Sequence, residues 1–286
     1  MDPAERVGIL GLGGIGMAIT RRLVAAGLAP CGFRRSDASS FAQAGGIVCL
    51  SVPQLVEQSD VVINTAPAGA IDSVLRAVEA GCAEVRGRVF IDAGVGPLEV
   101  RERQQRELQA AGASMLDAPV MGNPALVDAG QGVFYVSGDA KVSQRVRPLL
   151  LKIAAQAPQV GAFGAGTQLK LASNLLLAVH TAAAAEAMAL LTRAGLDPAL
   201  LLENLPPIAR SGVLATRGAA MASGRYDVGG GSTQALLEVM ERIAGDARML
   251  QAKVPMLQAA MRQFEGAVEA GHGQVDTPGV IRAWLT

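Results

Sequence analysis

The chain has 286 residues, of which 50% are hydrophobic and 17% are charged, and its 25 basic and 25 acidic side chains cancel. This balance gives no general attraction for nucleic acid or for anionic membranes, so neither partner is expected. The length exceeds what one hydrophobic core usually serves, and two domains are therefore expected.

The first predicted elements are an apolar strand at residues 6–10 and an amphipathic helix at residues 15–26, joined by the sequence GLGGIG. Gly11, Gly13 and Gly16 have the spacing G-x-G-x-x-G. Gly11 permits a tight turn, Gly13 lets the backbone approach a pyrophosphate, and Gly16 allows the helix to pack closely on the strand. The helix N-terminus offers N–H groups to the anion. The segment therefore predicts a dinucleotide site formed by Gly11, Leu12, Gly13, Gly14, Ile15 and Gly16.

The second strand ends in CGFRRS, about 20 residues beyond the glycines. An enzyme that prefers NAD places an acid there to bind the ribose hydroxyls. Here Arg34 and Arg35 stand in its place, followed by Ser36, and a guanidinium can pair with the 2′-phosphate of NADP. We therefore expect these three residues to bind NADP rather than NAD. The alternative is that the nearby Asp37 binds the ribose hydroxyls, as in an enzyme that prefers NAD.

Further apolar runs bounded by turn residues predict buried parallel strands, with helices such as residues 98–111 between several of them. Such βαβ units with right-handed crossovers build a doubly wound sheet. Ala66 and Pro67, which follow one of these strands, are assigned to the cofactor site. The expected strands are residues 61–65, 88–92, 114–117 and 133–136.

From about residue 165 onward the patterns are helical only, which predicts a dinucleotide-binding domain at residues 1–164 and an all-helical domain at residues 165–286. A long helix is expected from Gly166 to about Arg193. It contains an alanine-rich apolar run that is interrupted by a glutamate and by His180, which we expect in the core or at an interface. We do not expect this run to span a membrane.

The ends and the cysteines indicate a cytoplasmic protein. The acidic N-terminus lacks an apolar segment of signal-peptide length, so secretion is not indicated. Cys31, Cys49 and Cys82 are odd in number and lack metal-ligand spacing, so we expect no metal site. All three are interpreted as reduced, small core residues.

Five segments, taken together, carry a family resemblance: GLGGIG, FRRS, LDAPVMGNPALVDAG, GAGTQLKLASN and AGHGQVD. In order and approximate separation they resemble the β-hydroxyacid dehydrogenase family, which is related to 6-phosphogluconate dehydrogenase and includes 3-hydroxyisobutyrate dehydrogenases and tartronate semialdehyde reductases. The resemblance implies a Rossmann-type α/β domain followed by an all-α domain, with the active site between them. It also implies a homodimer, or a dimer of dimers, paired across the long helix.

The same resemblance implies that Lys170 matches the family's catalytic lysine and Asn174 the asparagine that helps to hold the substrate. These residues are four apart, so they share one helix face. Oxidising an alcohol by hydride transfer requires a group that removes the hydroxyl proton. A lysine suits this role when burial and the positive end of its helix lower its pKa. Asn174 can hydrogen-bond a substrate without exchanging a proton.

Departures from the family pattern concern the substrate more than the reaction. The substrate loop usually reads Ser-Gly-Gly, whereas here it is Met121, Gly122 and Asn123. Backbone N–H groups of this loop remain suited to an anion, but methionine favours a less acidic or bulkier substrate. Alignment with the family's nicotinamide-side lysine and aspartate places Met240 and Glu241 there, which makes Glu241 a weaker candidate for the substrate site, with a solvated helix face as the alternative.

The sequence thus predicts an NADP-dependent oxidoreductase that interconverts a small β-hydroxy acid and its semialdehyde-type partner, with Lys170 as general acid and base. Two alternatives stay open. One is an imine reductase, a related class that commonly carries aspartate or tyrosine at the lysine position. The other is a catalytically inactive dinucleotide-binding scaffold.

Overall fold

The computed structural model describes residues 5–34, 37–67, 69–94, 96–229 and 231–285. The chain separates into two compact units, Met1–Lys170 and Leu171–Thr286.

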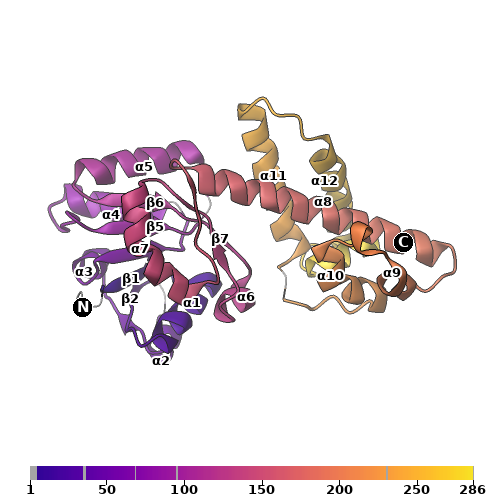
Figure 1. The fold of residues 1–286 in the computed structure, drawn as a ribbon, viewed down its shortest axis with the longest axis horizontal. Coiled ribbons are helices and arrows are strands. Elements are labelled where there is room, and N and C mark those ends of the chain that lie inside the picture. Colours follow the sequence, from indigo (N-terminus) through magenta and orange to yellow (C-terminus); the bar gives the residue numbers. More distant parts are fainter. Residues whose placement is uncertain (1–4, 35–36, 68, 95, 230, 286) are drawn as a thin grey trace. The chain divides into compact units, whose positions relative to one another are not determined.

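The first unit is built on a mostly parallel eight-stranded sheet with the order β10-β9-β6-β5-β4-β1-β2-β3 (Figure 1). Adjacent strands among β1 to β6 pair in parallel, whereas β9 pairs antiparallel with β6. The predicted doubly wound α/β class is confirmed. The strands are β1 (Val7–Leu10), β2 (Cys31–Phe33), β3 (Ile47–Val48), β4 (Val61–Asn64), β5 (Val89–Asp92), β6 (Ser114–Asp117), β9 (Val136–Ser137) and β10 (Gln159–Gly161).

Helices cover both faces of this sheet because the strand residues alternate between the two sides. Ile9, Ile63, Ile91 and Leu116 are in register across four strands and pack in one core with α1, α6 and α7. Their neighbours in the strands pack in a second core with α3, α4 and α5. The helices of this unit are α1 (Gly14–Ala25), α2 (Ser39–Gln43), α3 (Val52–Glu57), α4 (Gly69–Glu79), α5 (Leu98–Ala110), α6 (Pro124–Asp128) and α7 (Ala140–Ile153).

Two expectations for this unit were wrong. The segment 133–136 is not one parallel strand but two short ones: β8 (Val133–Phe134) pairs antiparallel with β7 (Val120–Met121), and β9 lies in the main sheet. A four-residue apolar run carries no signal for such a change of partner. Cys31 and Cys49 are buried as expected, but Cys82 is exposed after α4.

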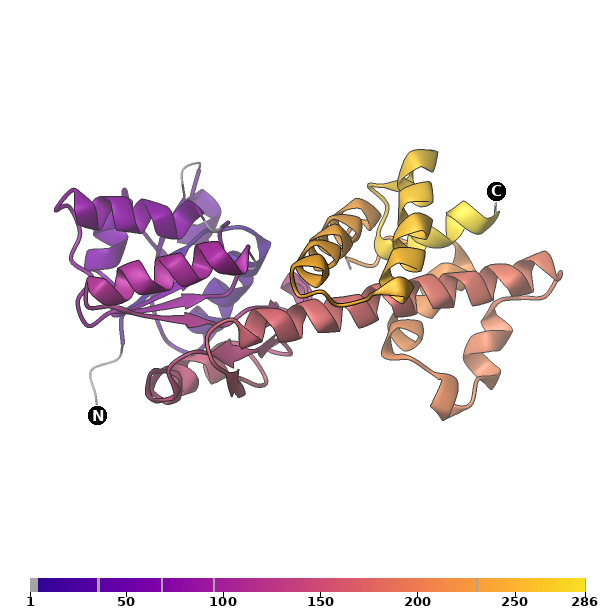
Figure 2. The same cartoon turned by 90° about the horizontal axis from the view of Figure 1, so that it is seen from above.

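The second unit is helical, and it gathers around α8 (Ala165–Arg193), which begins in the first unit (Figure 2). By length and composition α8 could cross a membrane, a property that core helices of soluble proteins share. Its alanines 178, 182 and 185 are buried within the structure. The other α-helices are α9 (Ala199–Asn204), α10 (Gly212–Ser223), α11 (Thr233–Met249), α12 (Pro255–Ala267) and α13 (Arg282–Leu285).

The glycine-containing tail AGHGQVD folds against the start of α11. Thr233 N donates to Val275 O at 2.8 Å, and Asp276 Oδ2 accepts from the N–H groups of Val228 and Gly229 at 2.8 and 2.7 Å. The tail therefore closes the loop that precedes α11 through its own backbone and one carboxylate.

Gly166, in the first turn of α8, has no room for a side chain because a Cβ there would overlap the carbonyl oxygen of Tyr135. We expect Gly166→Ala to lower the free energy of unfolding by about 1–3 kcal/mol, the usual cost of overpacking. Chemical denaturation measured by circular dichroism tests this.

Gly266→Ala is the matched control. Gly266 lies inside α12, and a Cβ there meets nothing within 4 Å. Alanine is the better helix former by about 1 kcal/mol, so this variant should be slightly stabilised. Equal effects of the two substitutions would contradict the close approach at Gly166.

Candidate functional site

The predicted glycine loop joins β1 to α1 and is tied to the turn after β4. Gly11 has φ +98°, and a Cβ there would lie 2.6 Å from Ala66 N. A Cβ on Gly16 would overlap the Gly11 carbonyl oxygen. That oxygen accepts a hydrogen bond from Thr65 Oγ1 at 2.6 Å. Two of the three glycines are therefore required by close approach of the backbone.

The start of α1 fits a pyrophosphate. Gly13 is the N-cap of α1. Among the described residues, no side chain caps this helix end, and the first turn of α1 carries no acid. A Cβ on Gly13 would meet nothing within 4 Å, so the loop is open on this side. Helix N-termini of this kind attract anions through their N–H groups and the helix dipole. Leu12 is buried below the loop, and Gly14 and Ile15 form the first residues of the helix.

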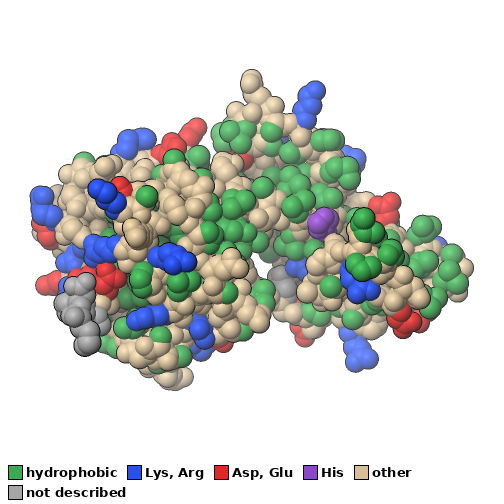
Figure 3. Space-filling model, viewed as in Figure 1, with side chains coloured by type: hydrophobic (Ala, Val, Ile, Leu, Met, Phe, Trp, Pro, Cys, Tyr) green, Lys and Arg blue, Asp and Glu red, His purple; other side chains and the backbone are tan. Residues whose placement is uncertain are grey.

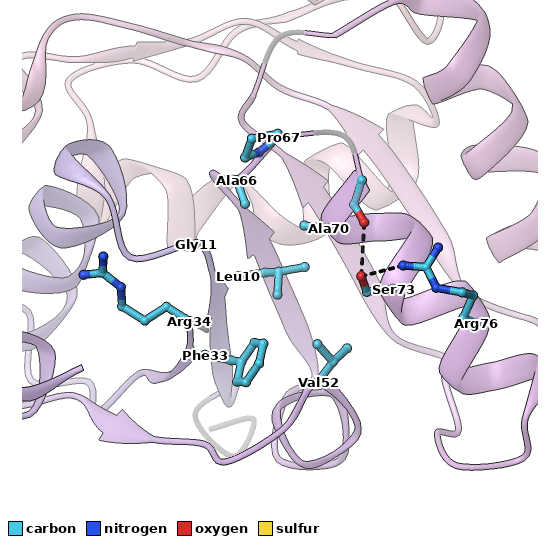
Figure 4. Close-up of a pocket in the computed structure, with 11 residues that line it drawn as sticks. Leu10, Gly11, Phe33, Arg34, Val52, Ala66, Pro67, Ala70, Ser73 and Arg76 are labelled. Atoms are coloured by element: carbon cyan, nitrogen blue, oxygen red, sulfur yellow. Dashed lines mark hydrogen bonds between the residues drawn. The ribbon is translucent and has the colours of Figure 1, made fainter. Parts of the chain in front are cut away.

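A cavity of about 610 Å³ opens beside this loop, at the carboxyl ends of β1, β2 and β4. Gly11, Ala66 and Pro67, all predicted cofactor residues, line it. Figure 4 shows Arg34 and Arg76 on opposite sides of the cavity, with apolar side chains between them. This is the point where the strand order reverses around β1, which is where open α/β sheets bind ligands.

Arg34 is exposed and donates to the carbonyl oxygen of Leu12 at 3.4 Å, so its guanidinium lies over the glycine loop. Arg35 and Ser36, predicted with it, lie outside the described residues. Asp37, the alternative ribose ligand, accepts from Ser39 N at 3.0 Å and from Ser39 Oγ at 2.6 Å, and these bonds lower its pKa. The Asp37 carboxylate thus already accepts two hydrogen bonds from Ser39, two residues further along the chain.

The predicted substrate loop lies near the glycine loop. Met121 ends β7, and Gly122 has φ +134°. Asn123 is the N-cap of α6, where its side-chain oxygen accepts from Leu126 N at 2.9 Å. Helix α6 packs on α1, and a Cβ on Gly14 would lie 2.9 Å from Pro124 Cγ. Residues 121–123 therefore lead into the helix that borders the start of α1.

Buried polar side chains form a row along the carboxyl edge of the sheet. Asn64, Asp92, Asp117 and Ser137 end β4, β5, β6 and β9, and they are in register across these strands. All four are at most 2% exposed. Asn64 Nδ2 donates to Asp92 Oδ1 at 2.9 Å, and Ser137 Oγ donates to Asp117 Oδ2 at 2.8 Å. The row places two carboxylates side by side in the interior.

Arg101 of α5 lies between these two carboxylates and is itself completely buried. Its Nε donates to Asp92 Oδ2 at 2.7 Å, and Nη2 lies 2.7 Å from Asp117 Oδ1. Burial by itself lowers the pKa of Arg101, but the charges of Asp92 and Asp117 outweigh it and raise the pKa above its ordinary value. The guanidinium therefore stays charged and neutralises one of the two aspartates.

Asp117 also holds the first turn of α8. Its Oδ2 accepts from Thr167 N at 2.9 Å and its Oδ1 from Thr167 Oγ1 at 2.8 Å. Ser137 Oγ accepts from Gly166 N at 3.0 Å, and Arg101 donates to Thr167 Oγ1 as well. A carboxylate at a helix N-terminus stabilises the helix because it accepts hydrogen bonds from the first N–H groups and interacts favourably with the helix dipole.

Lys170 and Asn174 follow on α8, one and two turns beyond Thr167, and both are partly buried. Lys170 belongs to the same compact unit as the glycine loop. Its helix begins at the edge of the sheet that carries this loop, because Thr167 N and Oγ1 are hydrogen-bonded to Asp117 at the end of β6. Asn174 lies one turn further on the same face.

Glu241 and His180 lie in the second unit. Glu241 is exposed on α11, beside the buried Met240. His180 is exposed rather than in the core: it lines a hollow of about 450 Å³ with residues of α9 and α10. Large apolar side chains are exposed on this unit, among them Ile208 at 98% and Leu190 at 71%, and Figure 3 shows hydrophobic surface over its helices.

Four side chains at this edge were not predicted from the sequence. Arg76 donates to Ser73 Oγ at 3.0 Å on the wall of the cavity, and Arg101 sits in the buried row. No signal singles out Arg101, because α5 is polar on nearly every side. Asp92 and Asp117 did have one, since an acid ends each of two buried strands. Among the described residues, no cluster of histidine, cysteine or acids is suited to a metal ion.

Two family models together cover nearly the whole chain. The NAD binding domain of 6-phosphogluconate dehydrogenase matches residues 6–163. A second model, described as NAD-binding of NADP-dependent 3-hydroxyisobutyrate dehydrogenase, matches residues 164–284. The matches meet between β10 and α8.

Individual relatives span the same length. An L-threonate dehydrogenase from Cupriavidus necator is 32% identical over 98% of this chain and 96% of its own. A 2-(hydroxymethyl)glutarate dehydrogenase from Eubacterium barkeri is 28% identical over 99% and 96%. The solved structure of Mycobacterium tuberculosis 3-hydroxyisobutyrate dehydrogenase with L-serine has a TM-score of 0.86 at 26% identity and covers 99% of both chains.

Removing the buried guanidinium should be far more damaging than removing an exposed one from the same helix. Arg101→Leu leaves two aspartates without their counter-charge, which should lower the free energy of unfolding by about 3–5 kcal/mol. Urea denaturation followed by circular dichroism measures this loss.

Arg103→Leu provides the control. Arg103 is about half exposed on α5 and pairs with Asp72 and Glu107 at 2.8 and 3.0 Å. Exposed pairs contribute at most about 1 kcal/mol. Similar losses of stability in the two variants would contradict the idea that Arg101→Leu leaves an uncompensated charge in the interior.

Proposed function

Because the chain belongs to the β-hydroxyacid dehydrogenase family, we propose that it is an NADP-dependent oxidoreductase acting on a small β-hydroxy acid or its semialdehyde, with Lys170 as general acid and base. The observation that supports this most is the placement of Lys170. It lies one turn into a helix whose start is bonded to Asp117, at the same edge of the sheet as the glycine loop and the cavity.

The proposed cofactor site consists of the glycine loop, residues Gly11 to Gly16, together with Arg34, Ala66 and Pro67. Arg35 and Ser36, which lie outside the described residues, are assigned to it from the sequence. The open N-terminus of α1 fits a pyrophosphate, and the cavity beside it fits an adenosine. NADP when bound would supply or accept the hydride at its nicotinamide. We assign the 2′-phosphate to Arg34. Arg76 lies on the opposite side of the cavity.

Proton transfer is assigned to Lys170. In the oxidation direction its neutral Nζ takes the proton of the substrate hydroxyl while the hydride leaves the carbon of the same alcohol. In reduction, protonated Nζ returns that proton to the carbonyl oxygen. A positioned general acid and base of this kind typically contributes about 10²- to 10⁴-fold to the rate.

Substrate binding is assigned to Asn174, the loop Met121 to Asn123, and less firmly Glu241. Asn174 shares the face of α8 with Lys170, so one substrate can meet both side chains. The Asn123 side chain caps α6, and the substrate carboxylate is assigned to the backbone of this loop. The relatives act on hydroxy acids, as their names L-threonate and 2-(hydroxymethyl)glutarate dehydrogenase state, and we propose a substrate of this class here.

Three broader assignments belong to the same proposal. We place the domain boundary between residues 164 and 165, close to the division of the compact units at residue 170. The exposed apolar surface of the helical unit supports a homodimer or a dimer of dimers. A cytoplasmic location is consistent with reduced cysteines, two of which are buried.

Lys170→Ala should lose turnover by at least a hundredfold because no other group would transfer the proton. NADPH affinity should stay within about threefold, since the cofactor is bound by the loops of the sheet. The assay follows NADP⁺ reduction with L-threonate and 3-hydroxyisobutyrate, and NADPH oxidation with semialdehydes and a cyclic imine. Affinity is measured separately by NADPH fluorescence.

Lys152→Ala, which removes an exposed lysine of α7, controls for the loss of charge and should behave as wild type. Hydroxy-acid turnover that survives in Lys170→Ala would overturn the assigned role. If the wild type turns over only the imine, and Lys170→Ala retains that activity, the chain would be an imine reductase instead. Absence of any turnover in the wild type with bound NADPH would favour a scaffold.

Cofactor preference is tested by Arg34→Ala. Loss of a charge-assisted bond to the 2′-phosphate should weaken NADPH binding by about ten- to a hundredfold and leave NADH binding nearly unchanged. Titration calorimetry with both nucleotides measures this. Arg86→Ala is the control, because Arg86 is exposed before β5, at the opposite edge of the sheet. Equal weakening of NADPH and NADH would exclude Arg34 as the selecting residue.

A further inference from the structure

The buried cluster of Asp92, Arg101, Asp117 and Thr167 takes no part in the proposed proton transfer. Its four side chains are at most 2% exposed, and one guanidinium faces two carboxylates. Burying ionised groups is unfavourable, and a well-packed apolar cluster of the same size is often as stable or more so. Stability alone is therefore a weak explanation for this cluster, and its contacts indicate another.

The contacts of Asp117, Ser137 and Arg101 meet at the first turn of α8. Asp117 accepts from both the N–H and the hydroxyl of Thr167, at 2.9 and 2.8 Å. The neighbouring Gly166 N donates to Ser137 Oγ at 3.0 Å. Arg101 donates to Asp117 and to Thr167, so it holds the acceptor and the residue that this acceptor binds. The start of the helix is thus bonded to β6, β9 and α5 together.

We propose that Thr167, held by Asp117 and Arg101, is a positioning residue that fixes the place of Lys170 in the reaction. Lys170 is three residues beyond Thr167, about 4.5 Å along the helix axis. A helix transmits a shift of its first turn to the next turn almost unchanged, so the Nζ of Lys170 moves with Thr167. The proposal rests on the proposed function, in which this Nζ carries the proton.

Small displacements are enough to matter for such a group. Proton transfer needs the donor and acceptor within hydrogen-bond reach, and a misplacement of about 1 Å can lower the rate about a hundredfold. The glycine loop and the turn after β4, by contrast, are joined by the bond from Thr65 Oγ1 to Gly11 O, in which Thr167 takes no part. Loosening the start of α8 should therefore lower kcat and leave cofactor affinity unchanged.

Thr167→Val tests this with little change in volume. It removes the hydroxyl from Asp117 and Arg101 but keeps the buried pair of Arg101 and Asp92. We expect kcat to fall at least tenfold with L-threonate or 3-hydroxyisobutyrate, whichever the wild type oxidises, and the Kd for NADPH to stay within twofold. The solvent deuterium isotope effect on kcat should rise as proton transfer becomes rate-limiting. Thr167→Ser, which retains the hydroxyl, should restore kcat to within about threefold of wild type.

Thr181→Val is the matched control. Thr181 is another buried threonine of α8, and its hydroxyl donates to Leu177 O at 2.7 Å. Its variant should lose thermal stability without a change in kcat. An unchanged kcat and isotope effect in Thr167→Val, while Lys170→Ala is inactive, would overturn the positioning role alone. Full turnover in Lys170→Ala would overturn the proposed function and this role with it.

Discussion

The ion cluster of Arg101 with Asp92 and Asp117 is the interaction on which the arrangement of the site depends. Two carboxylates end adjacent parallel strands in register, and they would repel each other in the interior without a cation between them. Arg101 supplies that charge from α5, the helix that connects these same two strands. The βα unit from β5 to β6 therefore carries its own counter-charge, and Asp117 is left free to bind the start of α8.

The topology explains why this cluster lies beside the cofactor loops. Strands β1, β4, β5 and β6 pair in parallel and so end at the same edge of the sheet, which the glycine loop, the turn after β4 and the two aspartates share. In β4 and β5 the other positions are apolar, and the polar Asn64 and Asp92 occupy the last one. The turn after β4 then joins the glycine loop through Thr65 and Gly11, which holds the loop in shape by protein contacts.

Sequence patterns determine the parts of this fold that follow from local periodicity. Buried strands, the glycine loop and the 29-residue helix α8 were all predicted to within a few residues, because each has a distinct run of apolar or glycine residues. The split at Val133 to Val136 was not, since it depends on which strands lie nearby. Arg101 was equally hidden: α5 carries several arginines, and only the position of the neighbouring strands decides which one is buried.

The difference between Lys170 and Glu241 has the same origin. Lys170 is close in sequence to Thr167, which is fixed to the sheet, so a helical register carries the position of one to the other. Glu241 lies on an exposed face of α11, more than 60 residues beyond that anchor, and motif alignment alone assigned it. The structure therefore supports the predicted position of a motif residue when the helix that carries it is bonded to the sheet close to that residue. The bonds of Thr167 thus fix the position of Lys170 relative to the sheet, whereas the proposed substrate role of Glu241 rests on motif alignment alone.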